Sequence, residues 1–240
     1  MRYIYSSNVR MIAENVKNIR DRIVSACVRA GRHPDEVTLV AVAKTFGAGM
    51  VGEVRNAGVV DIGENYVQDL RRKREELNDE RIRWHFVGHL QRNKVKELTS
   101  WIHLIHSIDS KRLAEEISHQ AAKAGRTVDI LVEVNTSGEQ TKFGVAPEET
   151  PTLVRELKDL PYVHVAGLMT IGPFLPNPED SRPAFRALRQ LRDHLQDNGI
   201  EIPHLSMGMS NDFEVAIEEG ATLVRVGTAI FGKRVKPDHN

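Results

Sequence analysis

The sequence predicts an α/β protein, a single (β/α)8 TIM barrel with one extra helix before it. Two observations lead to this prediction: short apolar runs alternate regularly with helical patterns, and the chain has 240 residues. Strands that alternate with helices pair in parallel through right-handed crossovers, and about 250 residues is typical of one barrel. We expect one domain over 1–240, with the extra helix at about 8–30 and the barrel at about 37–232.

The elements can be assigned in order along the chain. An apolar stripe predicts the extra helix and consists of Ile12, Val16, Ile19 and Ile23. Eight apolar runs are the predicted strands, at 38–43, 59–62, 83–87, 103–107, 128–134, 163–169, 204–207 and 223–226. Such runs indicate strands buried on both faces. The segments between them are predicted helices, several of which end at a glycine such as Gly125.

Composition argues against several classes of protein. The chain has 33 basic and 33 acidic side chains and hence no net charge, whereas a nucleic-acid or membrane-surface binder would carry a basic excess. No apolar stretch reaches the ~20 residues of a membrane span, and the N-terminus lacks the apolar core of a signal peptide. The single cysteine, Cys27, cannot form an intrachain disulfide. We expect a cytoplasmic protein.

Lys44 is the most informative residue. It follows the apolar run 38–43 and precedes a glycine-rich stretch. Parallel α/β folds bind ligands at the carboxyl ends of their strands. An amine held there against apolar walls can attack an aldehyde, whereas a lysine that only extends to solvent is the alternative.

The glycine-rich stretch itself suggests a competing interpretation. Residues 47–52 match G-x-G-x-x-G, the pattern of a dinucleotide-binding turn. However, three residues separate this stretch from the strand. The acidic residue expected about 20 positions later is also missing, since Asp61 and Glu64 come too soon. The dinucleotide hypothesis is therefore weakly supported.

The far end of the chain predicts a phosphate site. In such barrels the loops after strands seven and eight often bind phosphate with the N-terminus of a short helix. Ser210 is placed as the N-cap of the helix over 213–218, so its hydroxyl and the free amides can face an anion. Gly227 lets the backbone approach a ligand, and Thr228 adds an amide and a hydroxyl. Each turn alone would be an ordinary connection. Together with Lys44, they describe a site for a phosphorylated aldehyde.

Pyridoxal 5′-phosphate (PLP) fits this description, with its aldehyde on Lys44 as a Schiff base. Arg225, on the last strand, is expected to point inward toward the pyridine nitrogen. A cation there keeps that nitrogen neutral and weakens the ring as an electron sink. Strong carbanion chemistry usually has an acidic partner at this position. A structural ion pair is the alternative role for Arg225.

Seven blocks between Val37 and Gly232 resemble the pyridoxal phosphate homeostasis proteins, the YggS/PROSC family. They are AVAKT at 41–45, IGENYVQ at 62–68, HFVGHLQRNK at 85–94, VNTS at 134–137 with KFG at 142–144, GLMTI at 167–171, SMGMS at 206–210 and VRVGT at 224–228. One departure is Gly47, where many members have a proline.

The resemblance implies a barrel like the N-terminal domain of bacterial alanine racemase, with PLP on Lys44. The cofactor-binding residues are then Lys44, Asn65, Met209, Ser210, Arg225, Gly227 and Thr228. Family members have no firmly established catalytic activity and are thought to buffer, carry or deliver PLP. We therefore expect no catalytic residues, a monomer, and PLP-dependent apoenzymes as partners. The recipient enzymes are not identified by the sequence.

Other charged residues receive modest assignments. No histidine, cysteine and carboxylate set has a metal-ligand spacing, so we predict no metal. His103 and His106 are expected to point to opposite faces of a strand. The role of the block 85–94 stays open, and Lys142 is a candidate for a secondary PLP contact. The run 71–76 is expected to be a solvated helix face.

The predicted function is PLP binding in intracellular PLP homeostasis, without robust turnover. The alternative is a PLP-dependent amino-acid racemase, and an unrelated barrel enzyme with a phosphorylated substrate is a third possibility. Racemisation needs a proton donor and acceptor on each face of the substrate. Of the four tyrosines, Tyr3 and Tyr5 are expected to precede the first helix and Tyr162 to lie at the end of strand six away from the site. Only Tyr66 could approach the cofactor.

Overall fold

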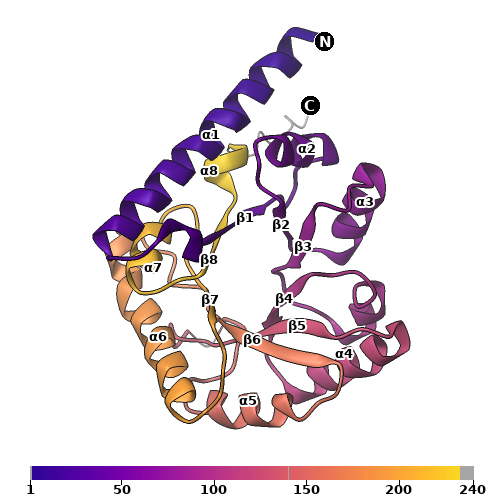
Figure 1. Ribbon diagram of the computed structural model, residues 1–240, viewed down its shortest axis with the longest axis vertical. Coiled ribbons are helices and arrows are strands. Elements are labelled where there is room, and N and C mark those ends of the chain that lie inside the picture. Colours follow the sequence, from indigo (N-terminus) through magenta and orange to yellow (C-terminus); the bar gives the residue numbers. More distant parts are fainter. Residues whose placement is uncertain (1, 140, 233–240) are drawn as a thin grey trace.

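The eight strands form one closed parallel barrel in the order β1 to β8, with helices outside it (Figure 1). This structure, a computed structural model, describes the backbone of residues 2–139 and 141–232. The predicted (β/α)8 barrel with an extra N-terminal helix is confirmed.

The boundaries of the elements are as follows. The strands are β1 (Thr38–Val42), β2 (Asp61–Glu64), β3 (Arg83–Phe86), β4 (Leu104–Ile108), β5 (Val128–Glu133), β6 (Val163–Met169), β7 (His204–Ser206) and β8 (Leu223–Val226). The α-helices are α1 (Arg2–Arg29), α2 (Ala48–Asn56), α3 (Val67–Leu77), α4 (Lys111–Ala124), α5 (Thr150–Lys158), α6 (Arg182–Asp197), α7 (Phe213–Glu218) and α8 (Thr228–Phe231). Three 3₁₀ helices are η1 (Pro34–Glu36), η2 (Arg92–Glu97) and η3 (Pro178–Ser181).

Three predicted boundaries were wrong. Strand β2 begins at Asp61 rather than at residue 59, because the Val59 N–H still bonds to the Val54 carbonyl in the turn after α2. The connection after β3 contains the 3₁₀ helix η2 where an α-helix was expected. The first helix begins at Arg2, so Tyr3 and Tyr5 lie within α1 and do not precede it.

Helix α1 completes the outer layer beside β8 and β1. Helix α8, which follows β8, has only 4 residues, and α1 packs against α7, α8 and α2 (Figure 1). Its predicted apolar stripe is buried, and the Asn15 side-chain amide donates to the Ile230 carbonyl (2.9 Å). Burial of a large aliphatic side chain contributes about 1.5–3 kcal/mol, so this stripe holds α1 firmly. No helix in the described part of the chain is both long and apolar enough to cross a membrane.

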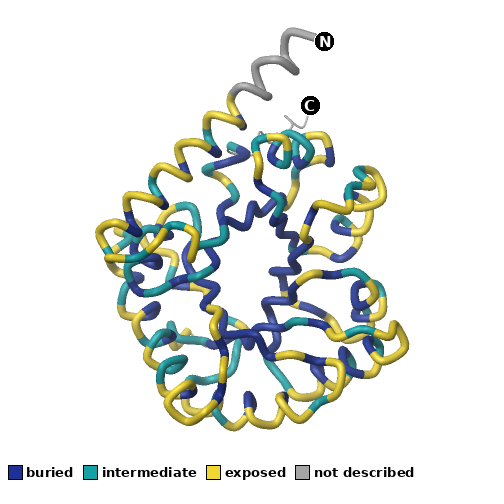
Figure 2. Tube along the Cα trace, viewed as in Figure 1, coloured by how far each residue is buried: buried dark blue, intermediate teal, exposed yellow. Residues whose placement is uncertain are grey.

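The barrel has two apolar layers. The larger layer lies between strands and helices, and Figure 2 shows buried strands inside helices whose outer faces are exposed. A separate cluster fills the interior and consists of Val40, Leu104, Leu131, Ala166, Met169 and Leu223. Side chains alternate between the two faces of a strand. Val40 and Val42 both face the position where Gly63 would carry a Cβ. The same alternation directs Lys44 to the interior side.

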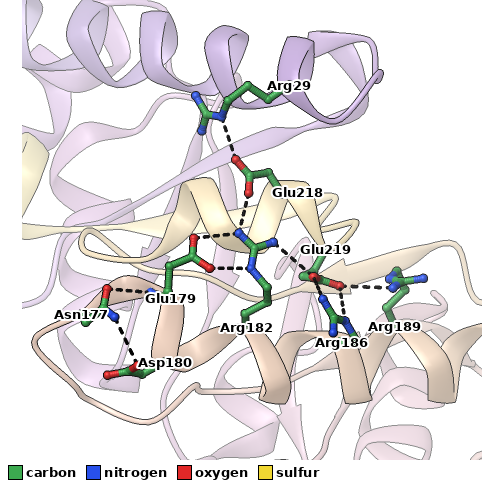
Figure 3. Close-up of polar contacts among 9 residues, drawn as sticks. All are labelled: Arg29, Asn177, Glu179, Asp180, Arg182, Arg186, Arg189, Glu218 and Glu219. Carbon is green, nitrogen blue, oxygen red and sulfur yellow. Dashed lines mark hydrogen bonds and ion pairs between the residues drawn. The ribbon is translucent and has the colours of Figure 1, made fainter.

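An ion-pair network fixes the outer surface near α7 (Figure 3). Glu219 is buried and accepts hydrogen bonds from Arg182, Arg186 and Arg189 on α6. Burial alone would raise the pKa of Glu219, but these hydrogen bonds outweigh it and lower the pKa. Next to it, Glu218 pairs with Arg182 and with α1. The network therefore holds α7, and the loop before it, against α6 and α1.

Candidate functional site

Lys44 lies in the turn that follows β1, at the mouth formed by the carboxyl ends of the strands. Its side chain is exposed, so the expected enclosure by apolar walls is not seen. The next residue, Thr45, has a φ of 71°. A left-handed conformation costs a β-branched residue on the order of 1–3 kcal/mol, and such strain clusters at functional sites.

A buried ion pair lies directly behind Lys44. Lys73 on α3 and Glu64 at the end of β2 are 1% and 0% exposed and are paired with each other. Lys73 Nζ also donates to the carbonyl of Ala43 (2.7 Å), the residue before Lys44. Burial raises the pKa of Glu64, and the ammonium group of Lys73 opposes this shift. Lys73 therefore connects the ends of β1 and β2 beneath the turn that carries Lys44.

Lys73 corrects the expectation that the whole run 71–76 is solvated. Its side chain continues the inner row of α3 that contains Val67 and Leu70. Residues three positions apart lie on the same side of a helix, so the spacing was a usable signal. The surrounding arginines and glutamates concealed it.

Asn65 presents an acceptor without a partner. Its backbone N–H bonds to the Glu64 carboxylate (3.1 Å), and its Oδ1 is buried with no hydrogen-bond partner among the described residues. A Cβ on Gly88 would lie 2.2 Å from the Asn65 carbonyl oxygen, so only glycine allows the loops after β2 and β3 to approach this closely. A buried unpaired polar atom is unfavourable, and this one is available to a ligand.

The loops after β7 and β8 meet at Ser210. Its Oγ accepts hydrogen bonds from the N–H groups of Gly227 (3.2 Å) and Ala229 (3.3 Å). Gly227 approaches β1 closely, since a Cβ there would lie 3.1 Å from the Val42 carbonyl oxygen. Thr228 is the first residue of α8. The predicted phosphate residues therefore lie together, and β8 is paired with the strand that ends before Lys44.

Ser210 does not have the predicted role of N-cap. Asp212 occupies that position in α7, and its Oδ1 accepts from the N–H of Met209 (2.7 Å). Asp212 directly precedes the helix, whereas Ser210 is two residues earlier and turns toward β8. The loop that contains Met209 is thereby fixed, but the hydroxyl of Ser210 serves the neighbouring loop instead of the helix.

Arg225 points into the barrel, as expected. It is buried and donates to Ser206 Oγ and to the Thr170 carbonyl (2.8 Å). Burial lowers its pKa to about 10, while the charge of Glu133 acts in the opposite direction. Burial likewise raises the pKa of Glu133, at the end of β5, to about 7, against the effect of Arg225. Among the described residues Arg225 forms no ion pair within 4.0 Å, so the alternative structural role is not supported.

A hydrogen-bonded chain crosses the interior from Arg225 to the opposite mouth. Because Ser206 accepts from Arg225, its own hydrogen is directed to His106 Nδ1 (2.9 Å). His106 Nε2 then donates to His85 Nδ1 (2.9 Å), and His85 Nε2 donates to Asp61 Oδ1 (3.0 Å). Burial lowers the pKa of both histidines, in keeping with neutral rings.

The sequence analysis missed this chain because its members are isolated polar residues within apolar strands. The expectation that His103 and His106 face apart was also wrong. Both rings contact His85, each with ring centroids 5.2 Å away. Strand alternation does not apply here, because His103 precedes β4, which begins at Leu104.

Lys142 lies on a loop that contributes to the same mouth as Lys44. Its Nζ pairs with Glu139 (2.6 Å) and donates to the Gly172 carbonyl in the loop after β6 (3.2 Å). The adjacent Phe143 stacks on His89 from the loop after β3, with centroids 4.0 Å apart. Lys142 is therefore held beside the mouth, and its role stays a prediction.

Comparison with known proteins assigns the family. Residues 8–235 match the alanine racemase, N-terminal domain family. The chain is 51% identical over 222 residues to the pyridoxal phosphate homeostasis protein of Aquifex aeolicus, covering 92% of this chain and 97% of the relative. The corresponding values for the Pseudomonas aeruginosa protein of the same name are 42% over 224 residues, 93% and 96%.

A solved structure of similar fold contains PLP. It is PipY of Synechococcus elongatus with PLP bound, which matches with a TM-score of 0.81 and 33% identity over 92% of this chain and 100% of PipY. Fold, site and sequence thus agree on the class of protein. The chain belongs to the pyridoxal phosphate homeostasis protein family, within the alanine racemase N-terminal domain family.

Proposed function

We propose that this protein binds PLP and takes part in intracellular PLP homeostasis by buffering, carrying or delivering it, without robust turnover. The observation that carries the proposal is the position of Lys44 beside the two amides of Gly227 and Ala229 that converge on Ser210. An amine and an anion-binding turn on neighbouring strands match the two reactive ends of a phosphorylated aldehyde. The PLP-bound PipY structure supports the same assignment.

The remaining residues have roles around this pair. When bound, PLP supplies an aldehyde that Lys44 Nζ can hold covalently as a Schiff base. Asn65 Oδ1 is a free acceptor for the ring substituents, and Met209 and Thr228 complete the phosphate loops. Arg225 is a buried cation for the ring-nitrogen side, fixed by Ser206 and Thr170. A cation there does not accept a proton, which disfavours strong carbanion chemistry.

The test is the absorption spectrum of the freshly purified protein before and after borohydride reduction. The expected result is a yellow protein whose colour is lost on reduction, with the reduced PLP adduct mapped by mass spectrometry to Lys44. An adduct on other lysines and none on Lys44 would refute the assignment.

The phosphate site gives a separate prediction. Ser210→Ala and Thr228→Val should each weaken PLP binding at least about tenfold, since a hydrogen bond to a charged group contributes about 1.5–3 kcal/mol. Equilibrium dialysis measures the affinities. Matched controls are Ser25→Ala on α1 and Thr127→Val before β5, both exposed and remote from the mouth. Unchanged affinity in both site variants would place the phosphate elsewhere.

The distinction between carrier and racemase gives a third prediction. We expect negligible racemisation of alanine and other proteinogenic amino acids at saturating PLP. General acid–base assistance is typically worth 10²–10⁴-fold, and the described residues offer a poor second partner for Lys44. Tyr66 is 62% exposed, and Tyr162 precedes β6 at the amino end of the barrel. A chiral assay that shows robust, Lys44-dependent turnover would instead support the racemase.

We also propose PLP-dependent apoenzymes as recipients. In support, large apolar side chains are exposed on the loops after β5 and β6, at the same mouth as Lys44. They are Phe143, Phe174 and Leu175, and Phe174 is 90% exposed. The monomeric state and the cytoplasmic location stay predictions.

A further inference from the structure

The amino ends of the strands enclose a second cavity, at the mouth opposite Lys44. Its volume is about 230 Å³, and its lining includes the first residues of five strands, from β1, β2, β3, β4 and β8. Four histidines border it: His85, His103, His164 and His204. Nothing in the proposed PLP function requires such a concentration of imidazole groups at this end.

Three side chains in this cavity place their donor atoms together. Asp61, His85 and His103 each offer one ligand atom, and these atoms all lie within 4.8 Å of one another. Asp61 Oδ1 and His85 Nε2 are 3.0 Å apart. The rings of His85 and His103 are 5.2 Å apart between centroids, with planes at 66°.

These separations suit a shared cation. Zinc binds imidazole nitrogen at about 2.0–2.1 Å and carboxylate oxygen at about 2.0–2.2 Å. Two ligand atoms at such distances are about 3 Å apart, and two imidazole rings on one tetrahedral ion have centroids about 5 Å apart. The cavity supplies room for a water ligand in the fourth position. We propose that Asp61, His85 and His103 bind a divalent first-row transition metal ion, such as zinc, at the amino-end mouth of the barrel.

Two further residues support this site. His106 holds the His85 ring from behind through Nδ1 (2.9 Å) and so leaves Nε2 directed at Asp61. A hydrogen bond at the second ring nitrogen is the usual way in which a metal-binding histidine is oriented. Binding releases the proton that His85 Nε2 shares with Asp61, because the metal requires the free nitrogen lone pair.

Arg83 now occupies the place of the cation. Its guanidinium group contacts both carboxylate oxygens of Asp61 (2.7 and 2.6 Å), but its side chain is 50% exposed and can turn into solvent. A metal ion would therefore replace Arg83 as the counter-charge of Asp61. This competition predicts that removal of Arg83 tightens metal binding, which a structural ion pair alone would not do.

The proposal departs from the expectation that no metal is bound. That expectation considered spacing along the sequence, where residues 61, 85 and 103 form no recognisable motif. The three ligands come from β2, from β3 and from the turn before β4, and only closure of the barrel brings them together.

The experiment is calorimetric titration of zinc into the untagged full-length protein, with cobalt absorption as a second readout of coordination. The expected result is one equivalent of metal. Changes in the outer shell of a metal site alone cost about 10–100-fold in affinity, so His103→Ala should weaken binding at least about tenfold. Arg83→Gln should tighten it. His119→Ala, an exposed histidine on α4, should change nothing.

Lys44→Ala serves as the control for the PLP site and should bind zinc as the wild type does. Circular dichroism confirms that each variant is folded. The absence of a one-to-one isotherm in the wild type would overturn the proposal, as would unchanged affinity in a folded His103→Ala variant.

Discussion

Replacing Lys44 by alanine should abolish the covalent attachment of PLP while the barrel stays folded. Lys44 is exposed and lies after the last residue of β1, and surface substitutions away from caps and networks usually change stability by less than about 0.5 kcal/mol. The phosphate loops keep Ser210, Gly227 and Thr228, so PLP should still bind weakly without the yellow colour. Absorption spectra, borohydride trapping and thermal melts measure these three properties.

The matched control is Lys123→Ala, an exposed lysine in the last turn of α4. It should keep the colour and the melting temperature of the wild type. A Lys44→Ala protein that remains yellow and gives a reduced adduct would show that another lysine carries PLP. A variant that lost its fold would contradict the view that Lys44 has no structural role.

The second large effect concerns Lys73. Lys73→Met should lower the free energy of unfolding by about 3–5 kcal/mol at pH 8, because it leaves the carboxylate of Glu64 buried without its cation. It should also weaken PLP retention, since the Ala43 carbonyl loses its donor beneath the Lys44 turn. Urea unfolding and equilibrium dialysis are the two measurements.

The pH dependence identifies the cause. Without Lys73 the folded-state pKa of Glu64 rises further above its unfolded value, since burial already raises it. An acid with a raised folded pKa is most stabilising when protonated, so its contribution falls as pH rises from the unfolded toward the folded pKa. The cost of Lys73→Met should therefore be smaller at pH 5 than at pH 8.

A double variant separates charge from packing. Lys73→Met with Glu64→Gln removes the unpaired carboxylate and should recover much of the stability lost at pH 8. A cost that does not depend on pH and persists in the double variant would mean that lost packing, not the buried charge, explains the effect.

The sequence predicts the barrel well because hydrophobic runs and helical stripes report burial directly. Lys44 and the loops after β7 and β8 could be found because parallel strands all present their carboxyl ends at one mouth. Lys73 could not be found in this way, since its neighbours on α3 are charged and exposed. Chain order specifies which loops meet, but it does not specify which polar residues are buried where they meet.

The polar interior shows the same limit. His106 and Ser206 are single polar residues in short apolar strands, where hydropathy is uninformative about which face they occupy. Strand β2 shows it too, because Asp61 and Glu64 are buried at its two ends by Arg83 and Lys73. Their partners lie on other elements, and only the closed ring supplies them.

The way in which α1 completes the outer layer has a consequence for synthesis of the chain. Helix α1 is made first, but α7 and α8, against which it packs, are made last. Between Arg29 and Phe213 about 180 residues must be added, which takes roughly 10–40 s at ~5–20 residues per second. During that interval the stripe that begins at Ile12 has no α7 or α8 to cover it. The nascent protein therefore presents an uncovered apolar helix to the cell until β8 joins β1, and the last few residues of the barrel determine when the first helix becomes safe from aggregation.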